Sequence, residues 1–297
     1  MKKLIYLYPI ILLFLYTSVK ASEWQDLLDI RLSKWETYLH IPEKSVHLSS
    51  QLNNSNNKIK KSVPIGIDND PLKVFESLNI NGEVVLKITG QIYGVIATRN
   101  EYENYHLKCE FKWGEKKWEP RLGKPRDSGI LFHSVGNFAA QGAWNQSIEC
   151  QIMENRTGDL ILVNKAEAFS PVIYRKGIKK PLYSPKGKLV NSKFVLRSPN
   201  NLHPNREYPN GEWNKVEIYT KDQTSIFLVN DIVSMVVLNA TCQLPSESRK
   251  PLTRGSIHLQ SEGVEVYYRR IKLRNIEKFP DNLQTILHQI SNNLIVN

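Results

Sequence analysis

Cysteine is scarce in this sequence, which contains only three in 297 residues. Because three is an odd number, at least one thiol stays unpaired within a single chain. Cys109 and Cys150 fall on the apolar side of predicted strands, so we expect buried free thiols, since cysteine packs like a small hydrophobic residue. No Cys-x-x-Cys pair occurs, so no thiolate zinc site is predicted. The acidic loop at 68–70 suits calcium or an ordinary turn equally, and we predict neither a metal nor a cofactor.

Long apolar runs are also rare, and the only one extends from Leu4 to Tyr16. It follows two lysines and is succeeded by Val19-Lys20-Ala21, which is the anatomy of a secretory signal peptide. The run is shorter than the roughly 20 apolar residues that span a membrane. We therefore predict a signal peptide over residues 1–21 and a single domain over residues 22–297. The protein is then secreted or periplasmic, with no membrane span after cleavage; the alternative is an uncleaved anchor.

Acidic residues are outnumbered, since 29 Asp and Glu stand against 40 Lys and Arg, for a net charge of +11. Such a balance is typical of proteins that bind nucleic acid or anionic surfaces. The basic residues are dispersed, however, and the densest clusters, at 58–61 and 175–180, lie in sequence typical of loops. No nucleic-acid-binding motif accompanies the charge, so we predict that nucleic acid is not a partner.

The dominant pattern in the sequence is a period-two alternation of apolar and polar residues. From Tyr105 to Trp113 the alternation is strict, which predicts a half-buried strand. The segments 83–89 and 94–98 have the pattern of a strand pair. Further strands are predicted at 128–134, 147–153, 160–163, 194–197, 214–220, 225–229, 233–238, 255–260 and 264–273. Many short strands with turn residues between them predict an all-β sandwich or barrel.

Two segments carry helical spacing instead. After Pro280, apolar residues recur at positions 283, 286, 287, 290 and 294, which predicts a short C-terminal amphipathic helix packed on the sandwich. Residues 24–39 also fit a helical period, but short strands with aromatic anchors give the same pattern, so the sequence leaves both interpretations open.

Alternation also places polar side chains together on one face of the predicted sheet. Glu149 and Gln151 alternate with apolar residues in one strand. His258 and Gln260 do so in another. Carboxylate, amide and imidazole groups suit a sugar, because sugar hydroxyls both donate and accept hydrogen bonds. Half of any surface strand is polar, so alternation alone is a weak indication of a site.

A set of segments carries a more specific pattern. They are LLDIRLSKWETYL from position 27, GQIYGVIATRNEYENYHLKCEFKWGEKKWEPR from 90, DSGILFHS from 127, SIECQIMENRTGD from 147, GEWNKVEIYT from 211, VNDIV from 229 and GSIHLQSEGVEVYYRRIKL from 255. In this order they resemble the 3-keto-disaccharide hydrolase domain, and they cover essentially the whole chain after residue 21. The resemblance implies a concanavalin-A-like jelly-roll β-sandwich, followed here by the short C-terminal helix.

Members of that family are associated with cleaving glycosides that are oxidised at C3 of the sugar. The 3-keto group acidifies the hydrogen at C2, so a base removes it, the enolate expels the C1 substituent, and water then adds for net hydrolysis. This chemistry needs a base, a stabiliser for the enolate and an acid for the leaving oxygen. The Glu-x-Asp-x-x-Glu strand of ordinary retaining glucanases is absent, because Gln151 stands in place of the central Asp.

Carried over by position, the resemblance gives candidate residues for chemistry and for binding. Glu149 is the first candidate for the base, or for a carboxylate that binds the sugar. His133 stands where many members carry Arg, and it has the chemistry of a base or a donor. The predicted catalytic residues are Glu149, His133 and Asp159, and the predicted substrate-binding residues are Gln151, Gln260, His258, Glu262 and Arg126. Each has a plainer interpretation as a turn, strand-end or solvated loop residue.

We therefore expect a secreted carbohydrate-active hydrolase or lyase whose partner is a carbohydrate. The alternative is a non-catalytic, lectin-like carbohydrate-binding module, because one fold hosts both activities. The enzyme hypothesis predicts a buried base with a strongly shifted pKa beside an amide or basic pocket. The binding-module hypothesis predicts an open aromatic groove without such a base.

Overall fold

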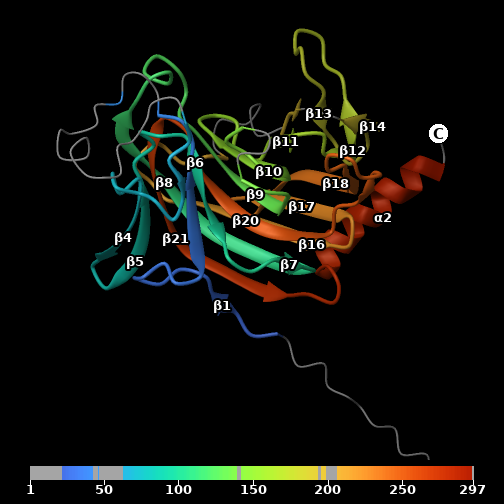
Figure 1. The fold of residues 1–297 in the computed structure, drawn as a ribbon. Helices are drawn as coiled ribbons and strands as arrows, with labels where there is room; N and C mark the ends of the chain where they lie inside the picture. The colour runs from blue at the N-terminus through green and yellow to red at the C-terminus, as the bar shows by residue number, and fades with distance from the viewer. Residues whose placement is uncertain are drawn as a thin grey trace, which may run out of the picture.

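Two antiparallel β-sheets pack face to face, with a helix at the C-terminal end of the chain (Figure 1). The computed structural model describes residues 22–42, 46, 63–138, 142–192, 195–198 and 206–295. The predicted signal peptide lies outside these residues. Within them, no helix is long and apolar enough to cross a membrane. The fold is the predicted all-β jelly-roll sandwich.

The larger sheet has twelve strands in the described part of the chain. Its order is β13 (Leu182–Tyr183), β12 (Glu167–Ile173), β18 (Ile232–Cys242), β17 (Thr224–Val229), β16 (Asn214–Lys221), β8 (Tyr105–Lys117), β21 (Val264–Asn275), β5 (Glu83–Ile88) and β4 (Phe75–Ile80). Three short strands join this path at its sides, namely β1 (Gln25–Asp26) on β21, β14 (Lys188–Ser192) on β12 and β19 (Lys250–Pro251) on β18.

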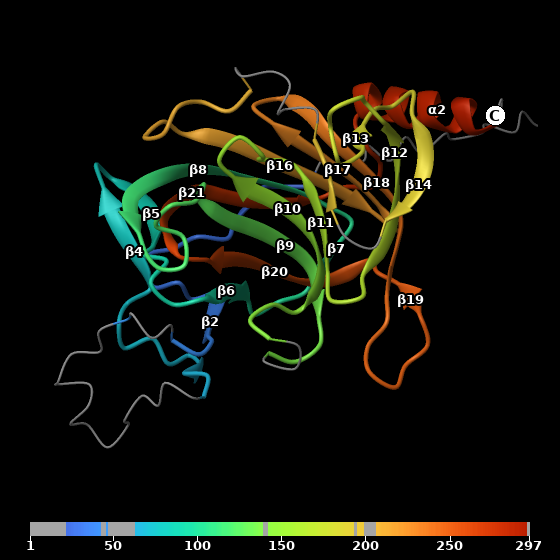
Figure 2. The same cartoon turned by 90° about the horizontal axis from the view of Figure 1, so that it is seen from above.

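The smaller sheet has nine strands among the described residues. Its order is β15 (Val195–Leu196), β11 (Leu160–Val163), β10 (Gln146–Met153), β9 (Asp127–Val135), β20 (Arg254–Ser261), β6 (Gly94–Thr98), β2 (Trp35–Leu39) and β3 (Gly66–Ile67). The short β7 (Tyr102–Glu103) pairs with β20. Figure 2 shows β10, β9 and β20 side by side at the middle of this sheet.

The hydrophobic core lies between the two sheets. Every second residue of β10, from Ile148 to Ile152, belongs to it, so the residues between them face the other side of the smaller sheet. Phe132 of β9 meets Phe227 of β17 edge to face across the core, with ring centroids 5.6 Å apart. Burial of each such ring stabilises the fold by about 1.5–3 kcal/mol. Because one face of β9 and β10 is buried in the core, a functional site on these strands must lie on their outer face.

The strand pair predicted at 83–89 and 94–98 is wrong, because the two strands belong to different sheets. β5 pairs with β4 and β21, whereas β6 pairs with β2 and β20. The chain passes from one sheet to the other through Gly90, where a Cβ would lie 2.0 Å from the carbonyl oxygen of Val264. Alternation defines the buried face of each strand but not its partner, so a crossover between sheets resembles a hairpin in sequence.

Residues 24–39 contain the strands β1 and β2, joined by a turn, rather than a helix. Trp35 anchors this region, since its indole Nε1 donates a hydrogen bond of 2.8 Å to the carbonyl oxygen of Leu27. The aromatic anchor therefore belongs to a short strand, which was one of the two alternatives that the sequence leaves open. The three cysteines are buried and free, which confirms the prediction for Cys109 and Cys150.

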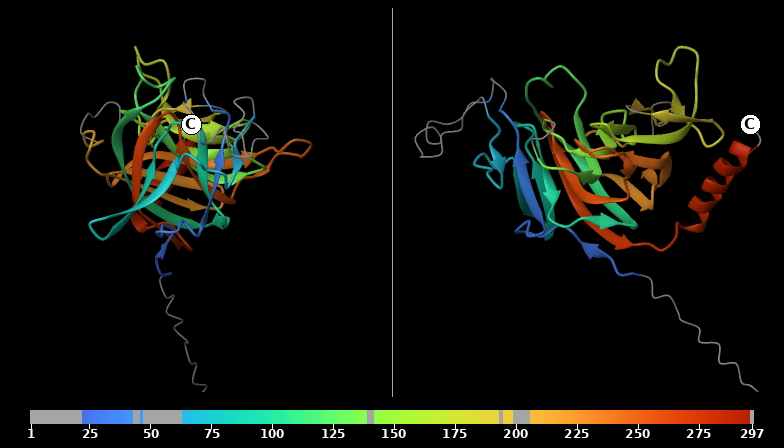
Figure 3. Two further views of the ribbon diagram at one scale, coloured as in Figure 1. Left: turned by 60° about the vertical axis from the view of Figure 1, so that its left-hand side comes forward. Right: turned by 45° about the vertical axis from the view of Figure 1, so that its right-hand side comes forward.

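The predicted C-terminal helix is α2 (Asp281–Ile295). Leu283 and Ile290 are buried against the rest of the protein. The amide Nδ2 of Asn293 donates to the carbonyl oxygen of Pro185, at 3.2 Å, which ties α2 to the turn before β14. Figures 2 and 3 show that α2 lies at the opposite end of the sandwich from β4 and β5.

Candidate active site

The outer face of the smaller sheet brings polar side chains from three neighbouring strands together. Glu149 of β10 and His258 of β20 both pair with Leu131 of β9, one from each side. Gln151 of β10 pairs with Gly129, which lies two residues before Leu131 in β9. Gln260 reaches the same glycine from β20. The register of the sheet therefore collects four of the predicted site residues on one face.

Gly129 allows two of these side chains to converge. A Cβ on Gly129 would lie 2.2 Å from Oε1 of Glu149 and 2.5 Å from Oε1 of Gln260. Real Cβ atoms essentially never approach a neighbour below 3.0 Å. Any larger residue would therefore displace Glu149 and Gln260 from the space above the strand.

Two further carboxyl groups join Glu149. The guanidinium of Arg121 contacts both the carboxylate of Asp127 and that of Glu262. The negative charges of Glu262 and Asp127 act in turn on Glu149. We call Asp127, Glu149, Glu262 and Arg121 the carboxylate cluster. Asp127 and Glu149 are only 2% and 4% exposed, so the cluster is shielded from solvent.

Burial raises the pKa of all three carboxyl groups in the cluster. The loss of water raises the pKa of Glu149 well above its ordinary value, and the charges of Glu262 and Asp127 raise it further. Burial raises the pKa of Asp127 to about 8, helped by Glu262 and opposed by Arg121. Burial also raises the pKa of Glu262, against the effect of Arg121. Near neutral pH Asp127 therefore holds a proton that it can donate.

Several buried acceptors around the cluster have no hydrogen-bond partner in the described chain. They are Oδ1 of Asp127, Oε1 of Gln151 and Oε1 of Gln260. An acceptor that is buried without a partner costs about 1–3 kcal/mol. A ligand with several hydroxyl groups would satisfy these oxygens, because each hydroxyl supplies a donor.

Aromatic rings contact this polar region at Arg121 and at His258. Tyr93, which is hydrogen-bonded to Arg121, stacks on Trp144 with ring centroids 6.1 Å apart. Phe138 stacks on Tyr38 at 5.2 Å and is tilted over His258 at 5.6 Å. Trp144 and Phe138 both come from the connection between β9 and β10. Flat rings beside polar groups suit the apolar faces of a sugar.

His258 lies on the site face but is closed off from solvent. Its Nε2 is 2.8 Å from the hydroxyl of Ser256, and its Nδ1 has no partner in the described chain. Burial lowers the pKa of His258 to about 3. The ring is therefore neutral at physiological pH, and Phe138 covers it.

His133 does not join the carboxylate cluster. It adopts a positive φ of 49° where the pairing of β9 with β20 shifts by one residue. Its ring meets Tyr105 of the larger sheet edge on at 5.7 Å, so the side chain lies against the core. Burial lowers the pKa of His133 to about 3. Strict alternation predicts that His133 lies on the same face as Glu149, but the β-bulge turns its side chain to the core side of the sheet.

Asp159 and Arg126 are held in ion pairs. A carboxylate oxygen of Asp159 lies 2.8 Å from Nη1 of Arg197, and the other accepts the backbone N–H of Ser198 at 2.6 Å. Arg126 contacts Glu154 at 2.6 Å and donates from Nε to the carbonyl oxygen of Gly114. Neither residue contacts the carboxylate cluster through these bonds; Asp159 ties together the segments before β11 and after β15, and Arg126 ties the loop before β9 to β8.

Comparison with known proteins places the chain in a family. The model of the family 3-keto-alpha-glucoside-1,2-lyase-like domain, the 3-keto-disaccharide hydrolase domains, matches residues 23–274. The chain belongs to this family. The chain is thus a carbohydrate-active domain that resembles glycosyl hydrolases. No curated protein matches its sequence.

Three solved structures that are similar to this chain have low sequence identity to it. A proposed glycosyl hydrolase from Parabacteroides distasonis is 17% identical, with 86% of this chain and 100% of that chain covered and a TM-score of 0.45. A β-glucanase from Bacillus licheniformis is 9% identical, covering 87% and 100%, with a TM-score of 0.37. A carbohydrate-binding module, CBM66, from Bacillus subtilis is 5% identical, covering 68% and 92%, with a TM-score of 0.37. These values are too low to distinguish an enzyme from a binding module.

Two residues of the carboxylate cluster, Asp127 and Arg121, are missing from the candidates predicted from the sequence. Asp127 lies two residues before Gly129, so alternation gives it the same face as Gly129, and this signal was available in the motif DSGILFHS. Arg121 lies in the loop before β9, and no sequence pattern gives its contact with Asp127. Among the described residues, no group of His, Cys, Asp and Glu side chains has an arrangement that could hold a metal ion.

Proposed function

We propose that this protein cleaves glycosides that carry a ketone at C3 of the sugar. A carboxylate removes the proton at C2, the enolate expels the C1 substituent, whose oxygen takes up a proton, and water adds to the unsaturated product for net hydrolysis. The observation that carries the proposal is the convergence of Glu149 and Gln260 over Gly129, beside the buried carboxyl group of Asp127. The signal peptide predicted at 1–21 makes an exported protein part of the proposal.

Glu149 is the base in this proposal. A carboxylate shielded from water is a stronger base than an exposed one, because burial penalises its charged form and raises its pKa. A hydrogen next to a ketone is a weak carbon acid, so its removal needs such a base. Gly129 gives the Glu149 carboxylate room to reach a sugar ring that lies over the strand.

Asp127 and Arg121 supply the complementary roles. With a pKa of about 8, Asp127 keeps a proton near neutral pH and can give it to the departing oxygen. Arg121 offers a positive charge to the enolate oxygen. Gln151 and Gln260 present buried acceptor oxygens to sugar hydroxyls. Tyr93 and Trp144 provide flat rings at the edge of this site.

The decisive experiment compares release of an aromatic aglycone from a 3-keto-glucoside and from the same glucoside without the ketone. We expect release from the keto substrate alone, and a loss of about 10²-fold or more in Glu149→Gln. Asp159→Asn is the matched control, because it also replaces a buried carboxylate but one that is paired with Arg197. It should keep the rate per folded molecule.

Two further outcomes would change the conclusion. Deuterium at C2 should slow release if the C2 proton is removed in a rate-limiting step, and an absence of any effect, with release equal for both substrates, would identify an ordinary hydrolase. Binding of the sugar without release from either substrate would favour the carbohydrate-binding module. The stacked pair of Tyr93 and Trp144 is the feature that supports this second function.

A further inference from the structure

The positive charge of the chain is concentrated in one segment. Residues 168–206 contain nine Lys and Arg and no Asp or Glu, whereas the whole chain has a net charge of +11. We call residues 168–206 the basic segment; it includes most of β12 and all of β13, β14 and β15. The prediction that the basic residues are dispersed is therefore wrong. Outside this segment the numbers of basic and acidic residues are nearly equal.

Most of these basic side chains are open to solvent. Six of them are exposed and form no ion pair within the part of the chain that the structure describes, namely Arg175, Lys176, Lys179, Lys180, Lys186 and Lys188. Arg197, in contrast, pairs with Asp159. Uncompensated charges of one sign attract ligands of the opposite sign.

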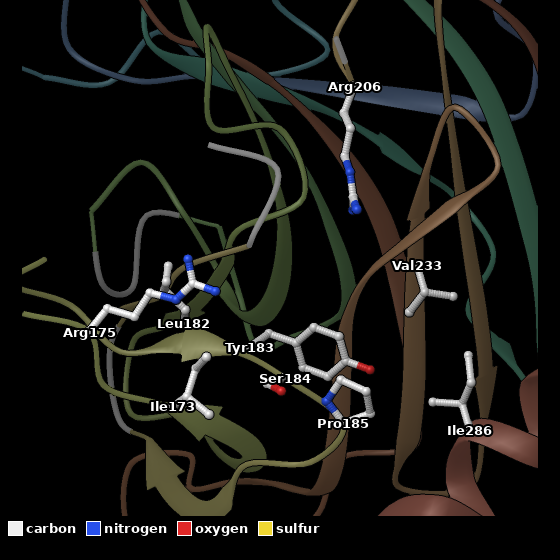
Figure 4. A pocket seen from close by; sticks show the side chains of 9 residues that line it. All are labelled: Ile173, Arg175, Leu182, Tyr183, Ser184, Pro185, Arg206, Val233 and Ile286. Carbon is white, nitrogen blue, oxygen red and sulfur yellow. The ribbon is translucent and has the colours of Figure 1, made fainter. Parts of the chain in front are cut away.

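A pocket of about 290 Å³ lies between the basic segment and α2 (Figure 4). Arg175 and Arg206 line it, and aliphatic side chains such as Ile173 and Val233 form much of its wall. Its lining includes no acidic residue. The volume is near the lower end of ligand pockets, which span roughly 300–1,000 Å³, so it has room for one ring rather than for a chain.

Tyr183 adds a polar atom to this pocket. The residue is only 4% exposed, and its hydroxyl has no hydrogen-bond partner in the described chain. Figure 4 shows its ring across the pocket, with the hydroxyl directed toward the side of Val233 and Ile286. A buried hydroxyl without a partner is costly, so it suits a polar atom of a ligand.

We propose that this pocket binds a uronate unit of an acidic glycan, whose neighbouring units lie along the exposed lysines of the basic segment. Guanidinium groups recognise carboxylates with charge-assisted and often bidentate hydrogen bonds, which Arg175 and Arg206 can supply. The aliphatic wall and the Tyr183 ring accept the C–H faces of the sugar. A fully aliphatic acid would leave the Tyr183 hydroxyl unsatisfied.

This site is separate from the proposed active site. None of the residues that line the pocket belongs to the carboxylate cluster. The proposal therefore does not depend on 3-keto chemistry, and it concerns which polymer the protein attaches to.

The experiment is calorimetric titration with hexagalacturonate and, as the matched ligand, its fully methyl-esterified form, which has the same rings without charge. We expect the ester to bind at least about tenfold more weakly, since a charged hydrogen bond is lost. Arg175→Gln/Arg206→Gln should weaken binding of the free acid by a similar factor. Lys73→Gln/Lys278→Gln removes two exposed charges elsewhere and should change the affinity less than twofold.

Three results would overturn the proposal. The first is equal affinity for the acid and its ester. The second is equal weakening by the pocket variant and the control variant, which would mean general attraction of charge. The third is equal affinity for single-stranded DNA of the same charge, which would make nucleic acid the ligand. Tyr183→Phe keeps the ring and the fold, and a several-fold loss of affinity in it would support a bound sugar in the pocket itself.

Discussion

The hydroxyl of Tyr268 on β21 lies 2.9 Å from the hydroxyl of Ser128 on β9, and this hydrogen bond joins the two sheets directly beneath Gly129. Ser128 also donates to the backbone carbonyl of Gln260, at 2.9 Å. The strands that carry the site are thus fastened to the opposite sheet at the position where Glu149 and Gln260 converge.

Removal of this link should lower stability more than activity. In Tyr268→Phe the ring keeps its packing, and Ser128 keeps its bond to Gln260, so we expect a loss of about 1 kcal/mol in the free energy of unfolding. Urea unfolding measures this change. Tyr174→Phe, at a residue that is 72% exposed, is the control and should be neutral. An unchanged midpoint in Tyr268→Phe would show that the bond contributes nothing.

Gly129→Ala should abolish activity with a modest effect on folding. The added methyl group would collide with Glu149 and Gln260, and displacement of a reacting group by about 1 Å can reduce a rate 10²-fold. We expect overpacking to cost about 1–3 kcal/mol of stability. Gly123→Ala is the matched control, because no atom lies within 4 Å of the new Cβ. Full activity in Gly129→Ala would show that Glu149 has no role in the reaction.

The rate of aglycone release should fall as the pH rises above about 8. Asp127 must be protonated to act as the acid, and its pKa is raised to about 8. Asp127→Asn should lower the rate and eliminate this alkaline limb, which a pH–rate profile reveals. Because the pKa of Asp127 in the folded protein exceeds its ordinary value of 3.8, its stabilising contribution is complete below 3.8 and is lost as the pH rises toward 8. If the rate of Asp127→Asn still falls above about pH 8, another group is responsible for that fall.

His133→Asn should retain activity and improve resistance to acid. Burial lowers the pKa of His133 from 6.5 to about 3, so its contribution to stability is present above pH 6.5 and is lost as the pH falls toward 3. Asn tolerates the positive φ at this position and does not titrate. Unfolding free energies between pH 7 and 4 should therefore fall less steeply in the variant. A large loss of aglycone release would instead support a catalytic role for His133.

Sequence reasoning identifies much of the fold, because alternation reports burial. Ile148 and Ile152 are in the core, and Glu149 and Gln151 are on the opposite face, as the pattern predicts. The predicted pairing of β5 with β6 is wrong, because alternation carries no information about which sheet a strand joins. The C-terminal helix is predictable because its apolar period is long enough to be distinct.

The site is only partly predictable from the sequence. Strand register collects Glu149 and Gln260, but Arg121 reaches the cluster from a loop, and loop contacts leave no periodic signal. His133 fails for a local reason, because one residue with positive φ turns its ring toward Tyr105. The ion pair of Asp159 with Arg197 likewise depends on tertiary contact between distant segments.

The shared space above Gly129 also constrains how this protein can change over evolutionary time. Positions 129, 149 and 260 occupy overlapping volume, so a larger residue at 129 is compatible only with shorter side chains at the other two. The three positions should therefore vary together among homologues rather than one by one. A relative that has lost the glycine would be expected to have lost the glutamate as well, and with it the inherited chemistry.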